Sequence, residues 1–177
     1  MRIVILGVLC IAAAGCAPEP IGPSASSSGE YENSGPVHPN PPITARQLEN
    51  GEPSHITVQH ILIAYSGSVE GKSISRSIVE AKQLANQVFE KAKTSDDFDG
   101  MVKEYTDDSH PGIYRMANFT IAGDMSSPNK ANWIYERGGM VPAFGNIGFQ
   151  LQVGEVGMST QDRKESPYGW HIIKRVE

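Results

Sequence analysis

Two histidines stand inside segments of β-forming residues, where polar side chains are uncommon. His60 lies in the run Val58-Gln59-His60-Ile61-Leu62, and His171 lies in Tyr168-Gly169-Trp170-His171-Ile172-Ile173. Both runs predict β-strands that belong to a sheet. Such a pair can act on a bound ligand, or it can only brace the sheet, and the two roles are compatible.

An apolar pair stands at the start of a predicted helix. Met140 and Phe144 are four residues apart, so on a helix they share one face. Pro142 fits the first turn, where a missing N–H does no harm. The pair suits an apolar wall for a ligand, and its alternative is plain core.

Several functional classes are excluded by what the sequence lacks. A Gly-x-Ser-x-Gly motif is absent, which argues against a serine hydrolase. The five histidines are accompanied by only two cysteines, both near the amino terminus, so we expect no metal site and no cofactor. The 15 basic and 20 acidic residues argue against a nucleic-acid-binding protein. The body should be a mildly acidic domain with one modest core.

The amino-terminal residues predict export and lipidation. Arg2 precedes an uncharged apolar run over 3–14, shorter than the roughly 20 residues that span a bilayer. Ala13-Ala14-Gly15-Cys16 is similar to a bacterial lipobox, with Ala13 where Leu is usual. We expect 1–15 to be a signal peptide and Cys16 to be lipidated. The alternatives are an ordinary signal peptide cut elsewhere, or a short anchor helix.

Residues 16–54 are expected to be a flexible, disordered linker. Eight of the twelve prolines lie between 17 and 54, among Ser and Gly and without apolar periodicity. Such a segment cannot bury enough surface to offset its ordering entropy. A proline-rich segment can also be a ligand for another domain. The folded domain is expected over 55–177.

The folded part reads as a small α+β domain. Ser77 and Glu80 form a capping box that opens a helix ending near Lys93. The remaining predicted elements are a strand over 56–65, a loop over 66–75, a helix over 96–105, a short strand within 113–121, a helix from 141, a turn into a strand over 152–156 and a strand over 168–176. We expect about four strands packed with three or four helices.

Five segments in order give the chain a family resemblance. They are 58–62, 104–109, 137–144, 153–156 and 168–173. Together they resemble the parvulin-type peptidyl-prolyl cis/trans isomerases, or rotamases, over about 55–177. The resemblance implies a parvulin-like fold and isomerisation of X–Pro bonds without a cofactor.

The resemblance also implies roles for particular residues. It nominates His60, Asp108 and His171 as the catalytic polar set. It nominates Met140, Phe144 and Tyr168 as substrate-binding residues. The alternative for Asp108 is a cap or turn of the Asp107-Asp108-Ser109 loop.

One segment departs from the family pattern. The usual Gly-Gly-Asp-Leu-Gly is replaced by a longer stretch over 116–133, with a remnant at Ala122-Gly123-Asp124. Asn132 is expected near the position of a pocket-lining Leu, so one wall of the pocket is rebuilt. Some members of the family that the chain resembles bind phosphorylated Ser-Pro through a basic cluster in the first loop. Here Lys72 and Arg76 are separated and Glu70 is nearby, so we expect no requirement for a phosphorylated substrate.

These features together predict a lipid-anchored monomer of the cell envelope. Ala17 after the lipidated Cys favours the outer membrane, with the domain facing the periplasm. The predicted substrates are proline-containing polypeptides, with no nucleic acid and no metal as partner. The alternative function is a chaperone-like module that binds unfolded chains without turnover.

Overall fold

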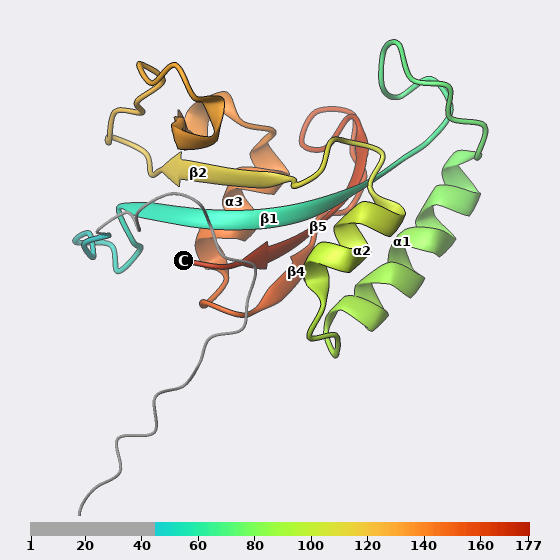
Figure 1. The fold of residues 1–177 in the computed structure, drawn as a ribbon, viewed down its shortest axis with the longest axis horizontal. Coiled ribbons are helices and arrows are strands. Elements are labelled where there is room, and N and C mark those ends of the chain that lie inside the picture. Colours follow the sequence, from blue (N-terminus) through green and yellow to red (C-terminus); the bar gives the residue numbers. More distant parts are fainter. Residues whose placement is uncertain (1–44) are drawn as a thin grey trace, which may run out of the picture. The chain divides into compact units, whose positions relative to one another are not determined.

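The computed structural model describes residues 45–177, and these residues form one sheet covered on both faces by helices (Figure 1). The strand order is β3-β2-β1-β5-β4. The strands are β1 (His55–Ala64), β2 (Ile113–Ala117), β3 (Ile134–Glu136), β4 (Val156–Met158) and β5 (Gly169–Arg175). The α-helices are α1 (Ile78–Ala92), α2 (Phe98–Tyr105) and α3 (Pro142–Gln150), and two short 3₁₀ turns are η1 (Lys130–Asn132) and η2 (Arg137–Gly139).

The central strand β1 sets the register of the sheet. It runs antiparallel to β2 on one side and to β5 on the other. His60 pairs with Ile173, and Leu62 pairs with His171. His60 and His171 are therefore diagonal neighbours on one face, close enough for side-chain contact.

Opposite faces of β1 belong to different cores, because successive side chains point to opposite sides. Helices α1 and α2 pack on the face that carries Ile61 and Ile63. Helix α3 packs on the face that carries Ile56 and Val58. His60, two residues after Val58, thus lies on the α3 face of the sheet.

Local sequence explains how the helices start and how closely one of them packs. The predicted capping box is present at α1, where Ser77 and Glu80 cap each other. Pro142 occupies the first turn of α3. A Cβ at Gly148 would lie 3.1 Å from Ile56 and 3.2 Å from Met116. Glycine here lowers helix propensity, but it lets α3 lie close against β1 and β2.

The predicted α+β, parvulin-like class is confirmed, with five strands where about four were expected. The fifth strand is β3, which pairs in parallel with β2 and for which the sequence predicted no strand. Its three residues are too few for an alternating pattern to be visible in the sequence. The three α-helices of residues 45–177 fall within the predicted number.

Residues 45–54, which the sequence placed in the linker, contact the domain. The Asn118 amide donates to the Ser54 carbonyl oxygen over 2.8 Å, and the Glu52 carboxylate pairs with Arg137. The predicted signal peptide, Cys16 and linker residues 16–44 lie outside the described residues. Within 45–177, no helix is long and apolar enough to cross a membrane.

Candidate active site

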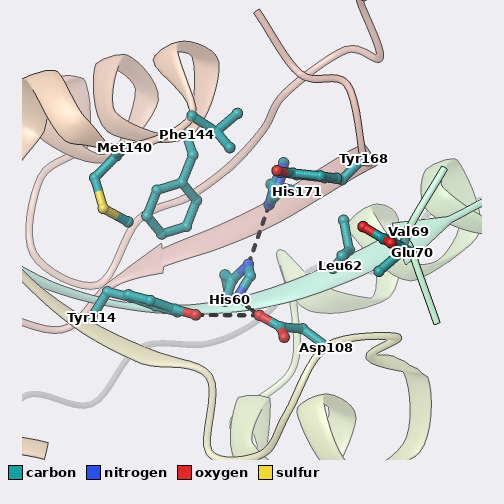
Figure 2. Close-up of a pocket in the computed structure, with 11 residues that line it drawn as sticks. His60, Leu62, Val69, Glu70, Asp108, Tyr114, Met140, Phe144, Tyr168 and His171 are labelled. Carbon is teal, nitrogen blue, oxygen red and sulfur yellow. Dashed lines mark hydrogen bonds and ion pairs between the residues drawn. The ribbon is translucent and has the colours of Figure 1, made fainter. Parts of the chain in front are cut away.

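A cleft of about 380 Å³ opens between α3, the centre of the sheet and the loop that follows β1 (Figure 2). It brings together all six residues nominated from the sequence, namely His60, Asp108, Met140, Phe144, Tyr168 and His171. Five further residues line it that were not nominated, namely Leu62, Val69, Glu70, Tyr114 and Val141.

A chain of hydrogen bonds forms the polar floor of the cleft. His60 Nε2 lies 3.3 Å from Asp108 Oδ2, and His60 Nδ1 lies 3.3 Å from His171 Nδ1 (Figure 2). The two imidazole rings stack with centroids 5.5 Å apart. Both histidines are buried, whereas the Asp108 side chain is 32% exposed. Asp108 is thus the member of the chain that solvent and a ligand reach most readily.

The carboxylate of Asp108 fixes the direction of this chain. The hydrogen bond from His60 is the main reason that the pKa of Asp108 falls to about 2, against an opposing effect of burial. A charged carboxylate accepts only, so His60 carries its proton on Nε2. In a neutral His60, Nδ1 then accepts from His171 Nδ1–H.

His171 is left with one buried lone pair. Burial lowers the pKa of His171 to about 3, with a smaller contribution from His60, so its ring is neutral near pH 7. Since Nδ1 of His171 donates, its Nε2 is an acceptor. This nitrogen is buried and has no hydrogen-bond partner among residues 45–177.

Helix α3 supplies the apolar end of the cleft. The Phe144 ring lies 5.1 Å from the His60 ring and 5.5 Å from the His171 ring, centroid to centroid. Met140 lies just ahead of the helix and Val141 is its N-cap. Met140 and Phe144 therefore both line the cleft, although Met140 precedes α3 and the two do not share a helix face as expected.

Tyr114 closes the wall that was expected near Asn132. Its ring packs 5.6 Å from Phe144, and its hydroxyl donates to Asp108 Oδ2 over 3.3 Å. Burial, followed by the Asp108 charge, raises the pKa of Tyr114 to about 12, so the hydroxyl keeps its proton. Asn132 does not line this cleft, and its side-chain amide instead donates to Ser127. The expectation for Asn132 was wrong, because Tyr114 of β2 supplies this wall instead.

The cleft suits non-covalent chemistry. Its lining residues include no Ser, Thr, Cys or Lys side chain to serve as an activated nucleophile. Within the described range 45–177, no group of three or more His, Cys, Asp or Glu is placed to hold a metal ion. The arrangement instead offers an apolar seat next to a charged carboxylate and a fixed pair of imidazoles.

Comparison with known families places residues 44–177 in one of them. This range matches the PPIC-type PPIASE domain. The chain is 31% identical over 114 residues to the foldase protein PrsA of Bacillus subtilis, covering 64% of this chain and 33% of that protein. It is 32% identical over 133 residues to the peptidyl-prolyl cis-trans isomerase ESS1 of Saccharomyces cerevisiae, covering 70% and 66%.

Further similarities are more partial. The chaperone SurA of Pseudomonas fluorescens is 29% identical over 119 residues, covering 67% of this chain and 22% of that protein. The crystal structure of PrsA from Bacillus subtilis superimposes with a TM-score of 0.40 at 26% identity, covering 70% of this chain and 35% of that one. The chain spans about a third or less of the length of these bacterial relatives.

Proposed function

The chain belongs to the PPIC-type, or parvulin, family of peptidyl-prolyl cis/trans isomerases, and we propose that its cleft isomerises X–Pro bonds of exported or envelope proteins. One observation carries this proposal. An apolar seat made by Met140, Phe144 and Tyr114 adjoins the linked polar set His60, Asp108 and His171 in a single cleft.

The chemistry needs no covalent intermediate. Rotation about an X–Pro bond breaks amide resonance, which costs about 18–20 kcal/mol, and takes tens to hundreds of seconds unaided. An enzyme accelerates it by binding the twisted amide more tightly than either planar isomer. An apolar seat holds the proline ring while the preceding carbonyl turns.

The polar set is proposed to act on the turning amide. Resonance places partial negative charge on the carbonyl oxygen of a planar amide, and twisting reduces that charge. A carboxylate beside this oxygen therefore repels the planar form more than the twisted form. Asp108 is charged and reachable, and His60 and Tyr114 hold it in place. His171 holds His60 in turn, and Tyr168 forms the rim.

The cellular setting is proposed from the sequence. A lipidated Cys16 and a proline-rich linker would tether a monomeric domain to the membrane, outside the cytoplasm and facing the periplasm from the outer membrane. The length of the linker would let the cleft reach segments of proteins that are still folding.

Isomerase assays on short Ala-Pro peptides test the function. The full chain should accelerate cis/trans exchange, and Asp108→Ala should lower kcat more than it raises KM. Phe144→Ala should weaken binding and turnover together, because the ring loses its apolar wall. Phe98→Ala is the matched control, since Phe98 is equally buried but in the core on the α1 and α2 face.

Two outcomes would contradict the proposal. A folded wild-type chain that suppresses aggregation of unfolded proteins but does not accelerate exchange would favour the chaperone-like module. Equal activity of the Phe144→Ala and Phe98→Ala proteins, measured below their melting temperatures, would show that the proline ring does not bind against Phe144 in this cleft.

A further inference from the structure

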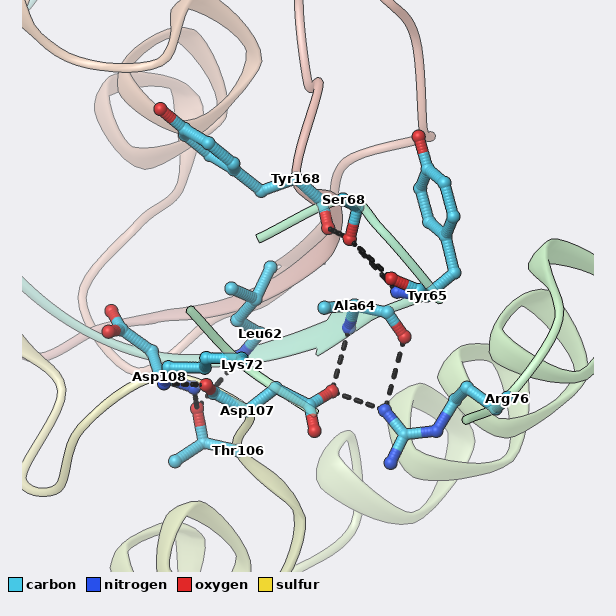
Figure 3. Close-up of polar contacts among 10 residues, drawn as sticks. All are labelled: Leu62, Ala64, Tyr65, Ser68, Lys72, Arg76, Thr106, Asp107, Asp108 and Tyr168. Atoms are coloured by element: carbon cyan, nitrogen blue, oxygen red, sulfur yellow. Dashed lines mark hydrogen bonds and ion pairs between the residues drawn. The ribbon is translucent and has the colours of Figure 1, made fainter. Parts of the chain in front are cut away.

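The loop after β1 is held against the domain by its own polar groups (Figure 3). The Ser68 hydroxyl donates to the Tyr168 carbonyl oxygen over 2.8 Å. The Lys72 ammonium donates to the Asp107 carbonyl oxygen, and the Arg76 guanidinium pairs with the Asp107 carboxylate. Arg76 also donates to the Ala64 carbonyl oxygen over 3.1 Å.

These contacts decide which charges of the loop face the cleft. Both of its cations are bonded to Asp107, and neither lines the cleft. Glu70 does line it, and its side chain is exposed. Asp108 supplies a second negative charge, while no Lys or Arg is among the lining residues. The cleft is therefore anionic, although two basic residues, Lys72 and Arg76, follow Glu70 closely in sequence.

The position of Glu70 in the cleft places it near the residue that precedes proline in a bound peptide. Figure 2 shows Phe144, Met140 and Tyr114 at one end, and Leu62, Val69 and Glu70 at the other, with the histidines and Asp108 between them. A proline ring in the apolar seat puts the reacting amide over the polar set. The residue before proline, which supplies the carbonyl of that amide, then extends towards the loop.

The loop end of the cleft has the chemistry to hold a long cationic side chain. Leu62 and Val69 offer apolar surface for a methylene stem, and Glu70 offers a carboxylate for the charged head. An acidic side chain in the same position would meet Glu70 and Asp108 with no cation to compensate.

We propose that Glu70 is a specificity-determining residue, which makes the cleft prefer X–Pro bonds whose X is Lys or Arg over those whose X is Glu or Asp. This proposal rests on the isomerase function proposed above and names the substrate class of that same site.

Steady-state assays of the full chain on Ala-X-Pro-Phe peptides, with X as Lys, Ala or Glu, test this. At low ionic strength kcat/KM should be about fivefold higher for Lys than for Glu, a ratio that corresponds to about 1 kcal/mol. The ratio should fall towards one in about 1 M salt, where the screening length is about 3 Å. Glu70→Gln should also bring the ratio towards one, and Glu70→Lys should invert it.

A control variant and a control peptide separate this idea from general charge effects. Glu90→Gln removes one negative charge from an exposed position of α1, where Glu90 pairs with Lys93, and should leave the ratio unchanged. A peptide with Lys after the proline should show no such preference. No turnover of any peptide would contradict the isomerase function itself. Turnover without discrimination, or discrimination that survives Glu70→Gln, would overturn the role of Glu70 alone.

Discussion

Arg137 provides the sharpest test of where the domain begins. Its side chain is 7% exposed, and its guanidinium donates to Glu52 over 3.0 Å and to Asn118 over 2.9 Å. It lies 4.5 Å from the Phe119 ring centroid and 4.7 Å from that of Phe149. Glu52, from the segment placed in the linker, is the one carboxylate that pairs with Arg137 among residues 45–177. We predict that Glu52→Gln destabilises the domain.

The magnitude follows from burial on the two sides of the pair. Removing one partner of a fully buried ion pair costs about 3–5 kcal/mol, because a charge is left uncompensated. The Glu52 side chain is 30% exposed, so water screens part of that charge, and Gln can still accept one hydrogen bond. We therefore expect a loss of about 1–2 kcal/mol, or a fall in Tm of roughly 5 °C.

Thermal and urea unfolding of the full-length variants measure this loss. Glu49→Gln is the matched control, because Glu49 is an exposed carboxylate of the same segment and should be nearly neutral. Truncation to 52–177 keeps the pair and should fold cooperatively, whereas truncation to 55–177 removes Glu52 and should cost about 2–3 kcal/mol. Isomerase activity of 55–177 should fall as well, since η2, which contains Arg137, leads directly into Met140 and α3.

Two results would refute this reasoning. Equal melting of Glu52→Gln and Glu49→Gln would show that the ion pair contributes nothing. Equal stability of the truncated proteins 52–177 and 55–177 would show that the domain begins at His55, as the hydrophobic pattern alone predicts.

Three further predictions concern the cleft and the anchor. Tyr114→Phe keeps the aromatic wall but removes a hydrogen-bond donor to Asp108. The pKa of Asp108 should therefore rise in an NMR titration, and kcat should fall with little change in KM. An unchanged pKa of Asp108 would contradict the hydrogen bond from Tyr114. The pKa of His171 is about 3 in the folded chain and about 6.5 in the unfolded chain. Between pH 3 and pH 6.5 the unfolded chain therefore binds more protons than the folded chain. The free energy of unfolding should rise with pH over this range, by at most about 1.4 kcal/mol per pH unit. Denaturation from pH 4 to 7 should show this slope, and a His171→Asn protein with the same slope would exclude His171 as its source. Cys16→Ala should abolish partition of the full-length protein into detergent after expression in a bacterium, and continued lipid labelling would disprove the anchor.

Much of the fold was predictable because its signals are local. The Ser77–Glu80 capping box and the proline at the start of α3 each act within one helical turn, so a short stretch of sequence suffices to place them. The two histidine-bearing strands were equally plain, because each is a dense run of β-formers. Met140 and Phe144 are four positions apart, which predicted a shared face, and both line the cleft.

Other features depend on residues far apart in sequence, and only the tertiary structure decided them. Tyr114 joins the cleft because β2 pairs with β1 in a register that sets it opposite Val58, two residues from His60. Strand β3 is three residues long and exists only through its pairing with β2. Glu52 belongs to the domain because its partner, Arg137, lies 85 residues later.

The charge of the cleft shows the same division. The sequence by itself determined that Glu70, Lys72 and Arg76 stand close together after the first strand. It did not determine which of them faces a ligand, because that depends on Asp107, which arrives from the end of α2 and binds both cations. Spacing along a chain fixes which groups are near one another in a loop or helix. The direction of each charge is fixed only when distant segments pack together and offer it a partner.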